Sequence, residues 1–319
     1  MKTMNVRWTR AILFGCAVLM FPGCDKSDEP MGQGQAEFQV TDAPSDDASI
    51  QSVFVTVSDI KVDGQSVAGY TRQTIDLKAY REGNVKVLGS ANLSAKGYST
   101  VSLVLDSDTD ASGNSPGSYV LTSDNSKFKL GNGGAIEVVV NKGWNVTANA
   151  KTTIVLDFDL RKAIRAMSDQ NVRYSFVSND DLRAAVRLVS EDKAGIVSGS
   201  YTEQSSTNSD MIVVYAYKEG TYNADTETVA QGDDAIFFKN AVSSTTVNND
   251  LNRSFKLAFL ESGNYELHFA SYTKDGLSGR YTFQSMLKSQ TTLNGTIGDT
   301  INVQAGVTAS VTALITGTI

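Results

Sequence analysis

The chain is poor in the side chains on which most catalytic and metal sites depend. Both cysteines, Cys16 and Cys24, lie in the first 24 of 319 residues, and His268 is the only histidine. The rest of the chain therefore excludes a disulfide, a cysteine zinc site and a cysteine nucleophile. A multi-histidine metal site is excluded too, and a Ser-His-Asp triad would have to use His268. Because no phosphate loop occurs either, we predict no catalytic residues and no enzyme.

Positive charge is also scarce. The chain has 28 basic and 35 acidic residues, and three of the basic ones lie in the first ten positions, which leaves the remainder with a net charge of about −10. Such an acidic surface argues against nucleic acid or an anionic membrane face as a partner. The hydrophobic content of 41% is enough for one large or two ordinary domains with cores of their own.

The first 24 residues have the pattern of a secretion signal. Lys2, Arg7 and Arg10 precede an apolar run over residues 11–21, which is too short to span a bilayer, and a Pro-Gly pair then leads to Cys24. This exit resembles the lipobox of bacterial lipoproteins, in which the cysteine is diacylated and becomes the mature N-terminus. The alternative interpretation is an ordinary cleaved signal with an incidental cysteine.

The resemblance implies a signal peptide over residues 1–23 and a protein held to a membrane by fatty acyl chains such as palmitate on Cys24. Each buried methylene adds about 0.8 kcal/mol of anchoring free energy. Residues 24–35 are polar and read as a flexible tether. Their acidic, serine-containing start resembles the export tag of surface lipoproteins of the Bacteroidetes. We therefore expect surface exposure on the outer membrane, with a periplasm-facing protein as the alternative.

From residue 36 onward the pattern is mostly that of β-strands. Val53, Val55 and Val57 share one face of a strand over residues 52–62, and a shift of the alternation at Ser58 and Asp59 indicates a bulge. The predicted class is all-β, with two antiparallel β-sandwich domains over residues 36–191 and 195–319. Asp159 is expected to cap one helix that includes Ile164 and Met167. Other strands are predicted over residues 74–77, 100–105, 118–121, 127–130, 135–140, 152–158, 172–176, 182–189, 196–201, 212–217, 235–240, 254–260, 264–271, 279–284, 300–303 and 310–315.

Several ordered motifs in the first unit resemble domain of unknown function 4382. They are FQVTDAP at residues 38–44, the AKGYS turn at residues 95–99 and IVLDFD at residues 154–159. This family has no established activity, so the resemblance implies a fold and a secreted or lipoprotein location. The second unit resembles transthyretin-like modules related to the regulatory domain of carboxypeptidases, on the GIVSG opening at residues 195–199 and the SGNYEL turn at residues 262–267. Such modules are Ig-like in architecture and mostly structural or adhesive.

Three aspartates form the main candidate acidic site. Asp42 begins an acidic turn over residues 42–47, where its carboxylate can accept bonds from main-chain N–H groups. Asp157 and Asp159 point to one face of a strand, so they could share a proton or a metal. The structural interpretation is that Asp159 caps the helix and Asp157 pairs with Arg161 or Arg183. The catalytic interpretation is a glycoside hydrolase that works with carboxylates alone.

Two further candidate sites lie in loops. Asp106, Asp108 and Asp110 stand at alternate positions before Gly113, a pattern that suits calcium, although the final glutamate of an EF-hand is absent. The alternative is an ordinary solvated turn. Thr300 lies in an Asp-Thr-Ile sequence that resembles the O-glycosylation site of exported Bacteroidetes proteins.

These observations predict a lipid-anchored cell-envelope protein with a non-catalytic binding, adhesion or surface-assembly role. Its expected partners are the membrane, through the acyl chains, and a glycan or another envelope protein. No cofactor is expected apart from calcium at the Asp106 loop. The alternatives are a carboxylate-dependent glycoside hydrolase and a calcium-stabilised structural module.

Overall fold

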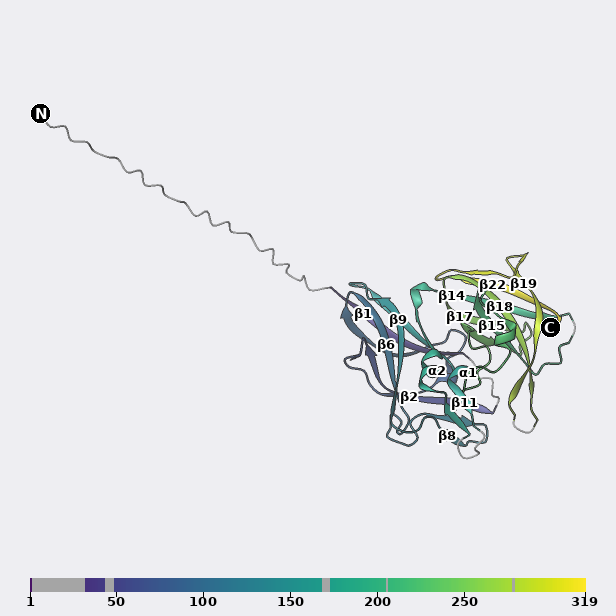
Figure 1. Ribbon diagram of the computed structural model, residues 1–319, viewed down its shortest axis with the longest axis horizontal. Helices are drawn as coiled ribbons and strands as arrows, with labels where there is room; N and C mark the ends of the chain where they lie inside the picture. The colour runs from purple at the N-terminus through teal and green to yellow at the C-terminus, as the bar shows by residue number, and fades with distance from the viewer. Residues whose placement is uncertain (2–31, 44–48, 168–172, 205, 277–278) are drawn as a thin grey trace. The chain divides into compact units, whose positions relative to one another are not determined.

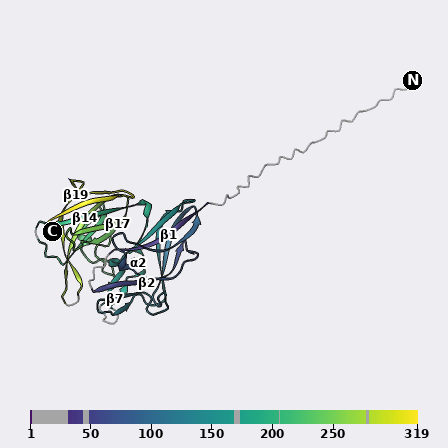
Figure 2. The ribbon, with the colours of Figure 1, turned by 180° about the vertical axis from the view of Figure 1, so that it is seen from behind.

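The computed structural model describes Met1 and residues 32–319, apart from residues 44–48, 168–172, 205 and 277–278. Residues 32–319 form one compact unit. Its regular secondary structure is mostly β-strand, arranged in several sheets, so the predicted all-β class is confirmed (Figures 1 and 2). None of the helices within the described residues is long and apolar enough to cross a membrane.

Residues 33–190 build two sheets and a small hairpin. The first sheet has the order β13-β10-β1-β5, from strands β1 (Gln33–Ala43), β5 (Lys86–Ser94), β10 (Lys151–Asp159) and β13 (Val186–Ser190). The second has the order β8-β7-β2-β6-β9, from β2 (Ile50–Val62), β6 (Gly97–Asp106), β7 (Tyr119–Thr122), β8 (Lys127–Lys129) and β9 (Ala135–Asn145), with β3 (Gln65–Ser66) and β4 (Gln73–Asp76) also paired to β2. The hairpin pairs β11 (Ile164–Ala166) with β12 (Tyr174–Phe176).

Residues 194–318 build a third sheet. Its order is β16-β15-β18-β19-β22-β14-β17, from β14 (Ala194–Glu203), β15 (Met211–Lys218), β16 (Ser243–Thr246), β17 (Ser254–Glu261), β18 (Gly263–Lys274), β19 (Tyr281–Leu293) and β22 (Thr308–Thr318), with β20 (Thr296–Ile297) on β19 and β21 (Ile301–Val303) on β18. The helices are short: η1 (Leu77–Ala79), α1 (Leu160–Ala163), α2 (Asn179–Ala184), η2 (Glu191–Lys193) and α3 (Ala224–Glu227).

The cores follow from the alternation of apolar residues along the strands. In β2, Val53, Val55 and Val57 are buried, and the register shifts between Val57 and Asp59, which confirms the predicted bulge. One core cluster draws its buried residues from positions 36–188, including Phe38 and Trp144, whose rings meet edge-on at 6.1 Å. Two other clusters draw theirs from positions 197–315 and 213–286. The predicted boundary between residues 191 and 195 stays a prediction.

Strand β15 is buried on both faces. Its residues Ile212 and Val214 belong to one core cluster, whereas Val213 and Tyr215 belong to another. An uninterrupted apolar run is typical of such a strand. The second face is covered by the loop that was predicted as a strand over residues 235–240. That prediction is wrong: Phe238 has a left-handed φ of 50° and stacks on Tyr215 with ring centroids 4.1 Å apart.

Other elements also differ from prediction. The expected strand over residues 182–189 begins as α2, capped by Ser178, and only its second half becomes β13. The expected helix after Asp159 ends after one turn and continues as β11. Most strand pairs are antiparallel, as predicted, but β1 pairs with β10 and β14 pairs with β22 in parallel. The first of these parallel pairs positions the candidate site.

Candidate functional site

The three predicted acidic residues come together at one end of β1 and β10. Because this pair is parallel, the carboxyl ends of the two strands lie side by side, with Asp42 opposite Phe158 and Ala43 opposite Asp159. Asp42, Asp157 and Asp159 expose only 5%, 7% and 9% of their surfaces. Burial disfavours a charged carboxylate unless a partner compensates for the lost water, so the partners decide what these residues do.

Asp157 is held by Arg187 of the neighbouring strand β13. The two residues are directly opposite in register, and the Arg187 Nε donates to Asp157 Oδ2 at 2.8 Å. Burial raises the pKa of Asp157, and although the charge of Arg187 lowers it, the pKa stays above its ordinary value. The predicted partners, Arg161 and Arg183, are wrong, because Arg161 binds Asp159 and Arg183 pairs within α2.

Asp159 binds two cations of α1. It stands at the N-cap position of this helix, yet its side chain makes no capping hydrogen bond within it. Its Oδ2 instead accepts from Arg161 at 2.8 Å and lies 3.3 Å from the Lys162 Nζ. Burial raises the pKa of Asp159, but the charges of Arg161 and Lys162 outweigh burial and hold the pKa below its ordinary value. Burial also lowers the pKa of Lys162, against the opposing effect of Asp159.

The same three cations bind main-chain carbonyls of the segment that leads through β16 to β17. Arg161 donates to Phe237, Lys162 to Ala241 at 2.6 Å, and Arg187 to Ala258 at 3.3 Å and Phe259 at 2.6 Å. Ala258 and Phe259 together oppose the single residue Ile196, so β17 has a bulge there, and Phe259 has a left-handed φ of 54°. Asp157 therefore orients an arginine whose other donors bind the carbonyls of a bulge.

Three more ion pairs join the same parts of the chain. They connect Arg165 to Asp234 at 2.6 Å, Lys239 to Asp181 at 2.7 Å and Lys142 to Glu261 at 2.7 Å. Residues 142–187 are thus tied to residues 234–261 by charged contacts at several points. The acidic cluster belongs to this junction, and its arrangement is that of a structural network.

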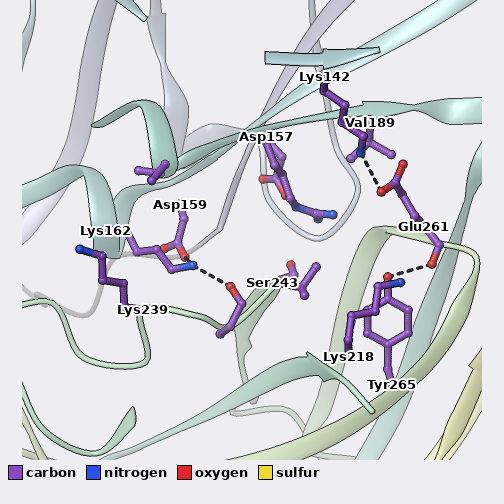
Figure 3. A pocket seen from close by; sticks show the side chains of 15 residues that line it. Lys142, Asp157, Asp159, Lys162, Val189, Lys218, Lys239, Ser243, Glu261 and Tyr265 are labelled. Atoms are coloured by element: carbon purple, nitrogen blue, oxygen red, sulfur yellow. Dashed lines mark hydrogen bonds and ion pairs between the residues drawn. The ribbon is translucent and has the colours of Figure 1, made fainter. Parts of the chain in front are cut away.

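A cavity of about 390 Å³ adjoins the network. We call it the basic pocket, because five cationic side chains line it: Lys142, Lys162, Arg187, Lys218 and Lys239. Figure 3 shows Lys142 and Glu261 on one side, Lys162, Asp159 and Lys239 on the other, and Asp157 between them. Sequence reasoning missed these cations, because lysine and arginine are ordinarily surface residues and no local motif marks them.

Asp42 does not line the basic pocket. With Asp157 it lines a separate cavity of about 20 Å³, which has room for about one water molecule. Neither carboxylate oxygen of Asp42 has a hydrogen-bond partner among the described residues. Burial raises the pKa of Asp42 well above its ordinary value, and the charges of Asp157 and Asp159 raise it further. Residues 46 and 47 of the predicted acidic turn lie outside the described residues.

The three aspartates of the predicted calcium loop engage separate partners. Asp106 pairs with Arg72 at 2.8 Å, Asp108 pairs with Lys129 at 2.6 Å, and Asp110 accepts from the main-chain N–H groups of Ser112 and Asn114, each at 2.8 Å. No group of three or more Asp, Glu, His or Cys side chains within the described residues has a metal-binding arrangement. The solvated-turn interpretation fits these contacts, and calcium binding stays a prediction.

Three other candidates have the following positions. Thr300 is exposed and donates to Glu219 Oε1 at 2.6 Å, which leaves its glycosylation a prediction. His268 stacks on Tyr222 with ring centroids 3.7 Å apart, and its Nε2 lies 3.7 Å from Glu266 Oε1. Cys24 lies outside the described residues.

Comparison with known proteins found a family model that matches part of the chain. Residues 33–178 match the family model described as "Domain of unknown function (DUF4382)". This match agrees with the resemblance read from the motifs in the first unit. No curated protein matches the chain.

Several solved structures are similar at low scores. A leucine-rich repeat protein from Bacteroides thetaiotaomicron has 11% identity and a TM-score of 0.22, with 89% of this chain and 26% of that protein covered. The major pilin subunit of Bacillus cereus has 9% identity and a TM-score of 0.21, with 90% of this chain and 70% of that protein covered. The minor pilin of Streptococcus agalactiae has 9% identity and a TM-score of 0.22, with 88% of this chain and 96% of that protein covered. The chain spans about a quarter of the first of these and 34% of the Bacillus anthracis TIE protein. These scores are too low to bear on the role of this chain.

Proposed function

We propose that this chain is a non-catalytic, lipid-anchored envelope protein that is displayed on the outer membrane and has a binding, adhesion or assembly role. One observation carries the non-catalytic part: each carboxylate that lines the basic pocket is bound to a cation. Asp157 is bound to Arg187, Asp159 to Arg161, and Glu261 to Lys142. Their contacts serve the junction between segments that are far apart in the sequence.

Glycoside hydrolysis requires a different arrangement. It needs one carboxyl group free to give a proton and a second free to attack or to activate water, both facing the sugar. Asp157 and Asp159 are held by arginines, and the small cavity beside Asp42 has no room for a sugar ring. The proposal would be contradicted if the wild-type chain hydrolysed any glycan and if replacing Asp157 and Asp159 with Asn abolished that activity.

The anchoring part rests on the sequence around Cys24. A positively charged start, a short apolar run and a cysteine at its exit agree with lipidation, and two or three acyl chains give durable membrane attachment. A protein that is fixed at a membrane and has no catalytic arrangement acts by binding other molecules. This favours a binding or assembly role over that of a freely secreted protein.

The test compares intact cells that express the wild-type chain or Cys24→Ser. We expect the wild-type chain to sediment with membranes and to be degraded when protease is added to intact cells. Cys24→Ser should lose membrane attachment because the thiol that carries the lipid is gone. Resistance to protease until the cells are lysed would contradict surface display, and unchanged sedimentation of Cys24→Ser would contradict the lipid anchor.

A further inference from the structure

The basic pocket has a charge opposite to that of the chain as a whole. The formal net charge of the chain is −7, yet five cationic side chains and only three carboxylates line this cavity. Cations gathered beside a buried wall repel one another and lose hydration, so an excess of two positive charges there is costly unless an anion enters.

The five cationic side chains differ in how many of their donors are already bound to partners in the protein. Arg187 and Lys162 direct their donors to Asp157, Asp159 and main-chain carbonyls, and they form a fixed wall of the pocket. Lys142 and Lys239 make single ion pairs, and their side chains keep 36% and 31% of their surface exposed. Ion pairs with this exposure contribute little free energy and exchange readily for another anion.

Lys218 differs from the other four. It has no ion-pair partner among the residues that the structure describes, and its Nζ lies 4.0 Å from the centroid of the Tyr265 ring. Tyr265 is fully buried, and its hydroxyl donates to the main-chain carbonyl of Glu261 at 2.8 Å, so the ring is a fixed support. A cation held on a rigid ring without a counter-ion presents its donors to an incoming anion.

We propose that the basic pocket binds a compact anionic group, a carboxylate or a phosphate, on a saccharide-sized ligand, with Lys218, Lys239 and Lys142 as donors. The cavity volume lies in the range of small-molecule sites. The acidic remainder of the chain repels extended polyanions, which favours a single compact anion. This inference rests on the proposed binding role and names the chemistry of its ligand.

The test titrates the full chain, in a nonionic detergent at low salt, with sodium glucuronate, sodium phosphate and neutral glucose by calorimetry. We expect saturable binding of at least one anion and none of glucose. Tighter binding of glucuronate assigns an acidic sugar, and tighter binding of phosphate assigns a phosphate ester. The double variant Lys218→Gln/Lys239→Gln should weaken anion binding at least tenfold. The matched control is Lys61→Gln, a partly exposed lysine paired with Glu137 far from the pocket residues in sequence, which should bind as the wild type does.

The absence of anion binding by the wild-type chain would overturn the inference, as would equal binding by the double variant. Melting curves of each variant show whether the fold is intact, and Lys142→Gln provides a second pocket variant if the double variant melts early. A failure here leaves the Cys24 experiment unaffected, so the anchored role would survive it. Conversely, turnover of a bound acidic sugar would contradict the non-catalytic role and leave the binding inference standing.

Discussion

Asp42 is the residue whose environment departs furthest from that of an ordinary aspartate. It is buried, neither carboxylate oxygen has a hydrogen-bond partner among the described residues, and two other carboxylates lie near enough to raise its pKa further. The protonated form of the Asp42 carboxyl group is favoured, because the neutral form avoids both the desolvation of a charge and the repulsion from Asp157 and Asp159. Asp42 should therefore make the stability of the fold depend on pH.

The sign follows from linkage. The folded pKa of Asp42 lies above its ordinary value of 3.8, so its contribution to stability is complete below that value and is lost as the pH rises through the folded pKa. Asp42→Asn removes this titration. We expect the melting temperature of the variant, relative to the wild type, to increase from pH 4 towards pH 8 by a few degrees.

The measurement is a series of thermal unfolding curves from pH 4 to pH 8. Asp180→Asn is the control, because the Asp180 side chain is 93% exposed and should shift all curves equally or not at all. A constant difference between Asp42→Asn and the wild type over the whole range would show that Asp42 does not titrate with a raised pKa.

At the scale of elements, Arg187 connects three strands. It lies on β13, binds Asp157 on β10, and donates to the carbonyls of the bulge in β17. Removing Arg187 leaves the Asp157 carboxylate buried without its cation. Breaking a buried ion pair in this way is strongly destabilising, because the remaining charge has no compensating partner. We expect Arg187→Met to lower the free energy of unfolding by about 3 kcal/mol. The melting temperature should fall by roughly 5–10 °C.

A double-mutant cycle separates the pair from the rest of the junction. Asp157→Asn in the Arg187→Met background should recover part of the loss, because it removes the unpaired charge and keeps the shape of the side chain. Arg183→Met is the matched control, since Arg183 is 44% exposed and its pair should contribute about 0.5 kcal/mol or less. Equal losses in Arg187→Met and Arg183→Met would contradict a structural role for the Asp157 pair.

The difference between these two arginines also shows how far the sequence predicts the site. Asp42, Asp157 and Asp159 could be selected because each is a carboxylate at the end of a strongly apolar strand, where burial is evident from the pattern. Their partners could not, because the register that sets Arg187 opposite Asp157 depends on where α2 ends and β13 begins. The predicted partners were Arg161 or Arg183, but Arg161 binds Asp159 and Arg183 binds Asp180 within α2.

The fold shows the same limit. Alternation along β2 revealed both the strand and its bulge, because both depend on neighbouring residues. Residues 235–240 have an equally apolar sequence, yet they form a loop whose Phe238 covers Tyr215. Strand β5 was missed because Gly89, Ser90 and Asn92 have low strand propensity, and its pairing with β1 is a tertiary effect.

At the scale of the whole molecule, the charged contacts have a thermodynamic consequence. Arg161, Lys162 and Arg187 each bind both a carboxylate in residues 157–159 and a carbonyl in residues 237–259. Unfolding of either part would leave these buried charges without half of their partners, so each part stabilises the other. Although the three core clusters draw on different stretches of the chain, we expect residues 32–319 to unfold in a single transition.

Differential scanning calorimetry of the wild type and of Arg161→Met/Arg187→Met tests this expectation. The wild type should give one transition whose calorimetric and van't Hoff enthalpies agree, and the double variant should give two transitions or a ratio of enthalpies well above one. Lys61→Gln/Lys129→Gln removes two ion pairs within residues 61–137 and should keep the single transition. Two independent transitions in the wild type would show that the junction does not couple the parts it connects, and the buried aspartates would then need another explanation.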